Sequence, residues 1–269
     1  MSATDGTRPP LRPASTGTQI RLLTVRLISK VLREPAVTIP NLAISVFFLF
    51  TYNGAFGDSG VTNFPGVGGN YLNFILPVTV LFSSISGGAA GLTLVQDLET
   101  GYFRRQLSMP LARSAIVLAA ILLGAIQVLV QATLIMSLGL LLGADPAAGF
   151  GGILALLFFA LLWGMGFAGY SVATGLKTGN AQAAQAATFI FFPLMFLAPV
   201  FLPMDQLAGW IQAIAKVNPT TYMLEAMRSV MIEGWVASSL LKGLAAGGIF
   251  ALITLTLAVR VARSKTARA

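Results

Sequence analysis

The sequence contains no cysteine and no histidine, and charged residues make up only 10% of its 269 residues. Without cysteine there are no disulfides and no thiol chemistry, and without histidine there is no imidazole base and no Cys/His zinc site. A nucleotide-binding G-x-x-x-x-G-K-[ST] motif is also missing. We therefore expect a chain that is not an enzyme, holds no metal or cofactor, and has no ATP site of its own.

Apolar residues, in contrast, make up 56% of the chain, which is more than a soluble domain carries. Several uncharged runs exceed the roughly 20 residues that a helix needs to cross a bilayer. The composition predicts an all-α integral membrane protein. Six transmembrane helices are expected, at residues 36–56, 71–95, 114–142, 150–174, 182–202 and 239–259. The fifth contains Pro193 and Pro199, so we expect a kink toward its end.

The chain has a net charge of +8, and the positions of its basic residues predict how it is oriented in the membrane. Most basic residues precede the first span, follow the last, or lie between spans two and three, and the positive-inside rule places such segments in the cytoplasm. Both termini are then cytoplasmic in a multi-pass protein of a bacterial inner membrane, and the charge does not indicate nucleic acid. Residues 1–17 read as a disordered tail, 36–262 as the membrane domain and 263–269 as a basic tail.

Residues 18–35 are amphipathic. Arg26, Lys30 and Arg33 recur at helical spacing on one stripe, with apolar residues on the other side. This pattern predicts a helix on the inner membrane surface, where the bases meet anionic lipid. The alternative is an amphipathic helix that packs on protein.

The segment 97–113, DLETGYFRRQLSMPLAR, is the most charged stretch between two spans. Two acids lead and three arginines follow, so a short helix with its acids at the start is expected. The segment can bind a cytosolic partner, or it is a solvated loop that only fixes topology. Its candidate residues are Asp97, Glu99, Gly101, Arg104, Arg105, Leu107, Pro110 and Arg113.

Before the last span, residues 203–236 are too polar and interrupted to cross a membrane. They predict short outer or re-entrant helices, the second starting at Asn218 and Pro219 in N-cap and first-turn positions and continuing through Tyr222. Glu225 and Arg228 are three residues apart on this helix. They form either a plain surface pair or a pair that braces an outer gate.

Two of the apolar spans contain glutamines. Gln127 and Gln131 share one face of the third span, and Gln182 and Gln185 begin the fifth. Such amides mostly bond across helices. The alternative is a substrate route, together with Phe189, Phe192 and Met195 of the fifth span. Because the middle of each span carries no charge, such a route suits an amphiphilic or aromatic cargo better than a small ion.

The order of these features resembles a family. A surface helix, six spans, the residues Glu99, Gly101, Arg104, Leu107, Pro110 and Arg113 after span two, and the sequence NPTTYMLEAMR at 218–228 together are similar to type 2 ABC transporter permeases. Within that family the chain is most similar to the daunorubicin-resistance and nodulation-factor export group. The resemblance covers about residues 20 to 262.

The resemblance implies a permease subunit that pairs with a second permease copy, identical or related. It implies that a separate subunit binds ATP and Mg²⁺ and docks on the 97–113 segment, the coupling helix, to drive drug or lipid-like export. Polysaccharide or glycolipid export is the alternative cargo. A gradient-driven transporter remains a further alternative, although such proteins usually carry acids or histidine inside their spans.

Overall fold

The computed structural model describes residues 15–33, 39–57, 60, 66–100, 112–189 and 191–266, and every regular element in these ranges is helical. The helices are α1 (Thr16–Arg33), α2 (Ile39–Phe56), α3 (Tyr71–Ser83), η3 (Ser84–Gly88), α4 (Ala89–Glu99), α6 (Arg113–Leu141), α7 (Gly149–Thr178), α8 (Ala181–Phe189), α9 (Phe191–Phe196), η4 (Met204–Gln206), α10 (Gly209–Val217), α11 (Pro219–Arg228), η5 (Ser229–Glu233) and α12 (Ala237–Thr266). The all-α prediction is confirmed for these ranges.

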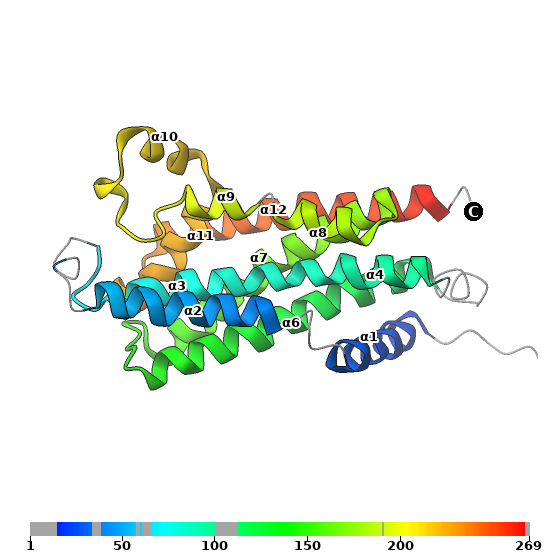
Figure 1. Ribbon diagram of the computed structural model, residues 1–269, viewed down its shortest axis with the longest axis horizontal. Helices are drawn as coiled ribbons and strands as arrows, with labels where there is room; N and C mark the ends of the chain where they lie inside the picture. Colours follow the sequence, from blue (N-terminus) through cyan, green and yellow to red (C-terminus); the bar gives the residue numbers. More distant parts are fainter. Residues whose placement is uncertain are drawn as a thin grey trace, which may run out of the picture.

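The long helices lie side by side as a bundle (Figure 1). We call the end that carries α1 and the C-terminus the α1 end, and the opposite end, which carries α10 and α11, the α10 end. Five stretches are long and apolar enough to cross a membrane: Ile39–Phe56, Tyr71–Glu99, Ser114–Leu141, Gly149–Thr178 and Ala237–Ser264. The chain is therefore a multi-pass membrane protein.

The fifth of the six expected spans differs from the prediction. Instead of one helix over 182–202, the chain forms the short helices α8 and α9 and leaves helical structure after Phe196. Pro193 lies in the first turn of α9, where its missing N–H costs nothing, and Pro199 follows the helix end. Since Ala181–Phe196 is shorter than the other candidates, the count of six spans stays a prediction.

The second span is longer than expected and changes helix type in its middle. It continues to Glu99 and contains a 3₁₀ stretch, Ser84–Gly88, between α3 and α4. Because the helix runs this far, Asp97 and Glu99 end α4, whereas the sequence suggested that they begin a separate helix. A carboxylate is unfavourable at a helix C-terminus, so these acids need nearby partners.

Helix α7 lies at the centre of the bundle and packs against α12, α6, α4 and η3. Two glycines of the second span make this approach close. A Cβ atom added to Gly87 would collide with the backbone of Gly164, and one added to Gly91 would collide with Ser171. Small residues at four-residue spacing therefore bring these two spans together.

Candidate transport pocket and coupling segment

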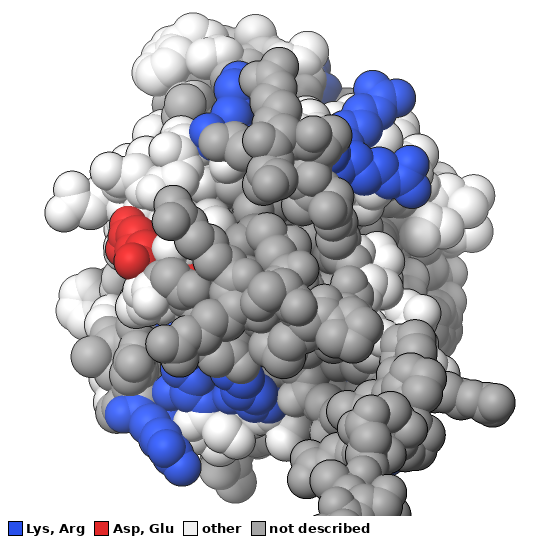
Figure 2. Space-filling view, turned by 90° about the vertical axis from the view of Figure 1, so that its right-hand side faces the viewer, with Lys and Arg blue, Asp and Glu red and all other residues white. Residues whose placement is uncertain are grey.

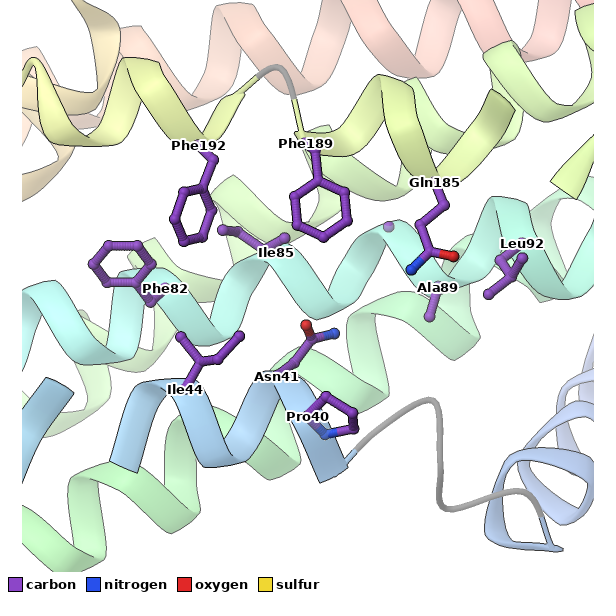
Figure 3. Close-up of a pocket in the computed structure, with 11 residues that line it drawn as sticks. Pro40, Asn41, Ile44, Phe82, Ile85, Ala89, Leu92, Gln185, Phe189 and Phe192 are labelled. Carbon is purple, nitrogen blue, oxygen red and sulfur yellow. The ribbon is translucent and has the colours of Figure 1, made fainter. Parts of the chain in front are cut away.

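A pocket of about 330 Å³ opens between α2, the second span and α8–α9. Figure 3 shows that its side chains converge from all three sides. Its lining comprises Pro40, Asn41, Ile44, Phe82, Ile85, Gly88, Ala89, Leu92, Gln185, Phe189 and Phe192.

The lining is apolar apart from two amides. Phe82, Phe189 and Phe192 supply aromatic surface, and Asn41 and Gln185 project their amide groups toward the space between the helices (Figure 3). None of the residues lining this pocket is charged. A ligand site of this kind takes an apolar or aromatic body and orients it through a few polar bonds.

The expected route residues fall in two places. Phe189 and Phe192 line the pocket, but Met195 is buried in the core beyond it. Gln127 and Gln131 are buried in α6, away from the pocket lining. Neither amide atom of Gln131 has a hydrogen-bond partner in the structure, so the predicted bond across helices is not formed at this residue.

Asn41 was not predicted to line the pocket, whereas Gln185 is one of the span glutamines with a possible place in a route. Asn41 stands beside Pro40 in the first turns of α2, and Gln185 faces it from α8. A polar amide in an apolar span was the available signal, since such residues usually meet a partner. Periodicity along one helix could not show that α2 and α8, which are far apart in the chain, lie side by side.

At the α1 end, Asp97 is buried and bonded to α1. Arg26 donates from Nη1 and Nη2 to its two carboxylate oxygens at 3.0 and 3.3 Å, and Lys30 Nζ lies 3.3 Å from Oδ1. Two of the three bases assigned to anionic lipid therefore face a carboxylate, while Arg33 is exposed. The cations offset the charge that α4 carries at its C-terminus.

The apolar side of α1 serves two neighbours. Leu27 packs in a buried cluster with residues of α4 and α6, as the alternative of packing on protein predicts. Leu22, Val25 and Leu32 stay exposed on another face. The exposed surface of α1 therefore combines apolar side chains with the bases Arg21 and Arg33, while Arg26 and Lys30 are partly covered.

The structure describes only part of the rest of the 97–113 segment. Gly101, Arg104, Arg105, Leu107 and Pro110 lie outside the described residues, and Arg113 begins α6. Glu99 is exposed in the last turn of α4, where its Oε1 accepts a bond from the N–H of Ala181 at 3.3 Å. The partner contact predicted for the segment stays a prediction, with Glu99 the exposed acid and Asp97 turned onto α1.

Figure 2 shows the surface of the α1 end, where lysine and arginine gather in separate groups and acidic side chains form one small patch. The exposed bases of the described helices there include Arg21, Arg33, Lys177 and Arg260. Basic residues close to the ends of membrane spans are typical of the cytoplasmic side.

At the α10 end, Asn218 has the predicted N-cap role. Its Oδ1 accepts from the N–H of Thr220 at 3.0 Å, and Pro219 occupies the first turn of α11. Its amide nitrogen also bonds to the carbonyl of Leu194, which ties α11 to α9. The hydroxyl of Tyr222 donates back to the carbonyl of Lys216 at the end of α10.

Arg228 does not form the expected ion pair with Glu225, although both residues lie in the described part of the chain. Instead, its buried guanidinium donates to the carbonyls of Phe74, Pro199 and Val200, at 3.1, 2.5 and 2.7 Å. Its Cζ lies 3.5 Å from the centre of the Phe74 ring, in cation–π contact. Pro199 has left helical structure, so its carbonyl needs a donor.

The electrostatics of α11 follow from this burial. Burial lowers the pKa of Arg228 to about 9, which still leaves the guanidinium charged at neutral pH. Burial also raises the pKa of Glu225, against the opposing effect of Lys242 and then Arg228. Glu225 is half-buried, and Lys242 of α12 affects it more than Arg228 does.

A bundle of apolar helices with an uncharged pocket and a charged segment between its second and third spans is the pattern of a transport permease. The family model described as ABC-2 type transporter matches residues 18–232. The chain belongs to this family.

Relatives extend over most of the chain. It is 26% identical over 268 residues to the "Daunorubicin resistance ABC transporter permease protein DrrB1" of Streptomyces coeruleorubidus, covering 97% of this chain and 91% of the relative. It is 24% identical over 252 residues to the "Probable doxorubicin resistance ABC transporter permease protein DrrC" of Mycobacterium tuberculosis, covering 92% and 90%. The "Putative transport permease ycf38" of Cyanophora paradoxa is 26% identical over 225 residues, covering 82% and 77%.

Proposed function

We propose that this chain is the membrane subunit of an ATP-driven exporter. A separate subunit binds ATP and Mg²⁺, docks on the 97–113 segment at a cytoplasmic α1 end, and works on a pair of permease chains. Two relatives over nine-tenths of the chain carry names of drug-resistance ABC permeases, which supports this assignment.

The proposed type of cargo follows from the residues that line the pocket. Three phenylalanines and two amides, with no charge in the lining, fit an amphiphilic or aromatic molecule. A small ion would find no counter-charge there, and a polysaccharide would meet too few hydrogen-bonding groups. A glycolipid could also bind to this lining, because its acyl chains are apolar.

A gradient-driven transporter is the rival from another class. Such proteins place ionisable side chains in the middle of their spans. In the five candidate spans of the described chain, acids occur only at Asp97 and Glu99, in the last turn of α4. The rival therefore lacks a group that could carry a coupled proton.

The test is co-purification with a candidate ATP-binding subunit, followed by ATP hydrolysis in lipid. Glu99→Arg reverses the exposed acid next to the proposed docking segment, so we expect loss of the complex or of the hydrolysis that the permease stimulates. Asp145→Arg makes the same change at an exposed site of the α10 end and is the matched control. A wild-type chain that binds no ATP-binding subunit, or equal effects of both variants, would contradict the docking site.

A further inference from the structure

Helix α1 is attached to the bundle on both sides of the stretch 101–111. Before the stretch, the Asp97 carboxylate bonds to Arg26 and Lys30. After it, the N–H of Ala112 donates to Oε1 of Gln19 at 2.8 Å. One helix thus holds the end of α4 and the start of α6.

The first attachment is shielded and charge-assisted. The Asp97 side chain is 5% exposed, and those of Arg26 and Lys30 are 33% and 24% exposed. Arg26 reaches both carboxylate oxygens with its fork of donors, a geometry that also fixes orientation. Without the carboxylate, two cations four residues apart on α1 would repel each other.

The second attachment lies at the start of α6. Ala112 is the N-cap residue of α6, and alanine has no side chain that could accept a bond from the first N–H groups. The buried amide of Gln19 acts at this helix start by accepting the N–H of Ala112. Because Gln19 is fixed on α1, the position of the α6 start depends on α1.

Apolar packing joins the two attachments. Leu27, next to Arg26 on α1, lies in one buried cluster with Leu94 of α4 and Ile116 of α6. Helix α1 also packs along α6. The three helix ends are therefore held together by ionic, hydrogen-bonded and apolar contacts.

We propose that Asp97 is a positioning residue and that α1 acts as a strap across the base of the coupling segment. The strap makes α1, the end of α4 and the start of α6 move as one unit, so that a displacement of residues 101–111 shifts both spans. The part played by a partner rests on the proposed function. The strap itself is a property of this chain alone.

A spin-label experiment tests the strap without any partner. The chain has no cysteine, so cysteines at the exposed positions Leu22 on α1 and Lys177 at the end of α7 provide a single labelled pair. In the full chain in lipid, mixed with an excess of unlabelled cysteine-free chain so that a pair carries one labelled copy, we expect one narrow distance distribution. Asp97→Asn should broaden it and add a second population, and the double variant Arg26→Gln/Lys30→Gln should do the same from the other side. Arg33→Gln, at an exposed base of the same helix, should leave it unchanged.

The rescue variant Asp97→Arg/Arg26→Asp/Lys30→Gln exchanges the charges of the Arg26–Asp97 pair and removes the cation that would face the new arginine. It should restore the narrow distribution in monodisperse protein. An unchanged distribution in Asp97→Asn, or a broad one in the rescue variant, would overturn the strap.

A second measurement takes the same variants into the complex. Asp97→Asn should keep the ATP-binding subunit bound but lose the stimulated part of ATP hydrolysis, and the exchange should recover it. Dissociation of the complex by Asp97→Asn would overturn the positioning role in favour of a direct contact. If the wild-type chain binds no ATP-binding subunit, the proposed function fails, while the spin-label result still decides whether α1 is a strap.

Discussion

Replacing Arg228 should destabilise the protein more than replacing any other charged residue of α11. Its guanidinium satisfies three backbone carbonyls from two separate parts of the chain, Phe74 in α3 and the pair Pro199 and Val200 after α9. Arg228→Met keeps much of the side-chain volume but removes every donor. The three carbonyls would then lose their donor at a buried site.

The expected loss of stability in Arg228→Met follows from these bonds. A buried acceptor that loses its partner costs about 1 to 3 kcal/mol, and the cation–π contact adds about 1 kcal/mol. The variant no longer has to bury a charge, and this offsets part of the lost free energy of unfolding. We expect a net loss of about 3 kcal/mol, or roughly 6 to 12 °C in the unfolding midpoint of a chain this size.

Two further variants distinguish the hydrogen bonds of Arg228 from its charge and from a pair with Glu225. Arg228→Lys keeps the charge but has one nitrogen in place of the fork, so it should recover only part of the loss. Glu225→Gln should change the midpoint little, because burial already disfavours the ionised carboxylate and Arg228 takes its bonds elsewhere.

The assay is thermal unfolding in detergent, followed by monodisperse elution and by tryptophan fluorescence. The reasoning would be refuted if Arg228→Met unfolded at the wild-type temperature. It would also be refuted if Glu225→Gln were as costly as Arg228→Met, since the surface-pair interpretation would then hold.

Two other predictions concern the pocket and the helix crossing. Gln185→Leu should weaken binding of a fluorescent aromatic probe, measured by titration, about fivefold, because one hydrogen bond worth about 1 kcal/mol is lost. Gln131→Leu, away from the pocket, should leave the affinity unchanged, and equal effects would place the ligand elsewhere. Gly87→Ala should cost about 1 to 3 kcal/mol of stability because its Cβ meets the backbone of Gly164; Gly248→Ala, which meets nothing within 4 Å, is the control in the same unfolding assay.

Much of the fold could be predicted because a bilayer imposes length and polarity on each helix. Five of the expected spans appear within a few residues of their predicted bounds, and Asn218 caps α11 as its position before a proline indicated. The fifth span could not be predicted in the same way. Proline limits the helix there, and whether such a helix bends or ends depends on its neighbours.

The site was harder to predict because its residues come from distant segments. Phe189 and Phe192 were identified from one span, but the pocket exists only where α8–α9 faces α2 and the second span. Spacing along one helix shows which residues share a face, as for Gln127 and Gln131. It does not show which helix that face meets, and here it meets the core.

The two buried charged residues in the described part of the chain, Asp97 and Arg228, share a feature that the sequence did not reveal. Each stands in the last turn of a helix, and each bonds to groups more than twenty residues away along the chain. Local spacing suggested other partners: lipid for Arg26 and Lys30, and Glu225 for Arg228. A buried charge costs so much free energy that the fold must supply partners wherever it has them. In a chain with few charges, those partners tie one segment to another, so α1 is fixed to α4 and α11 to α3.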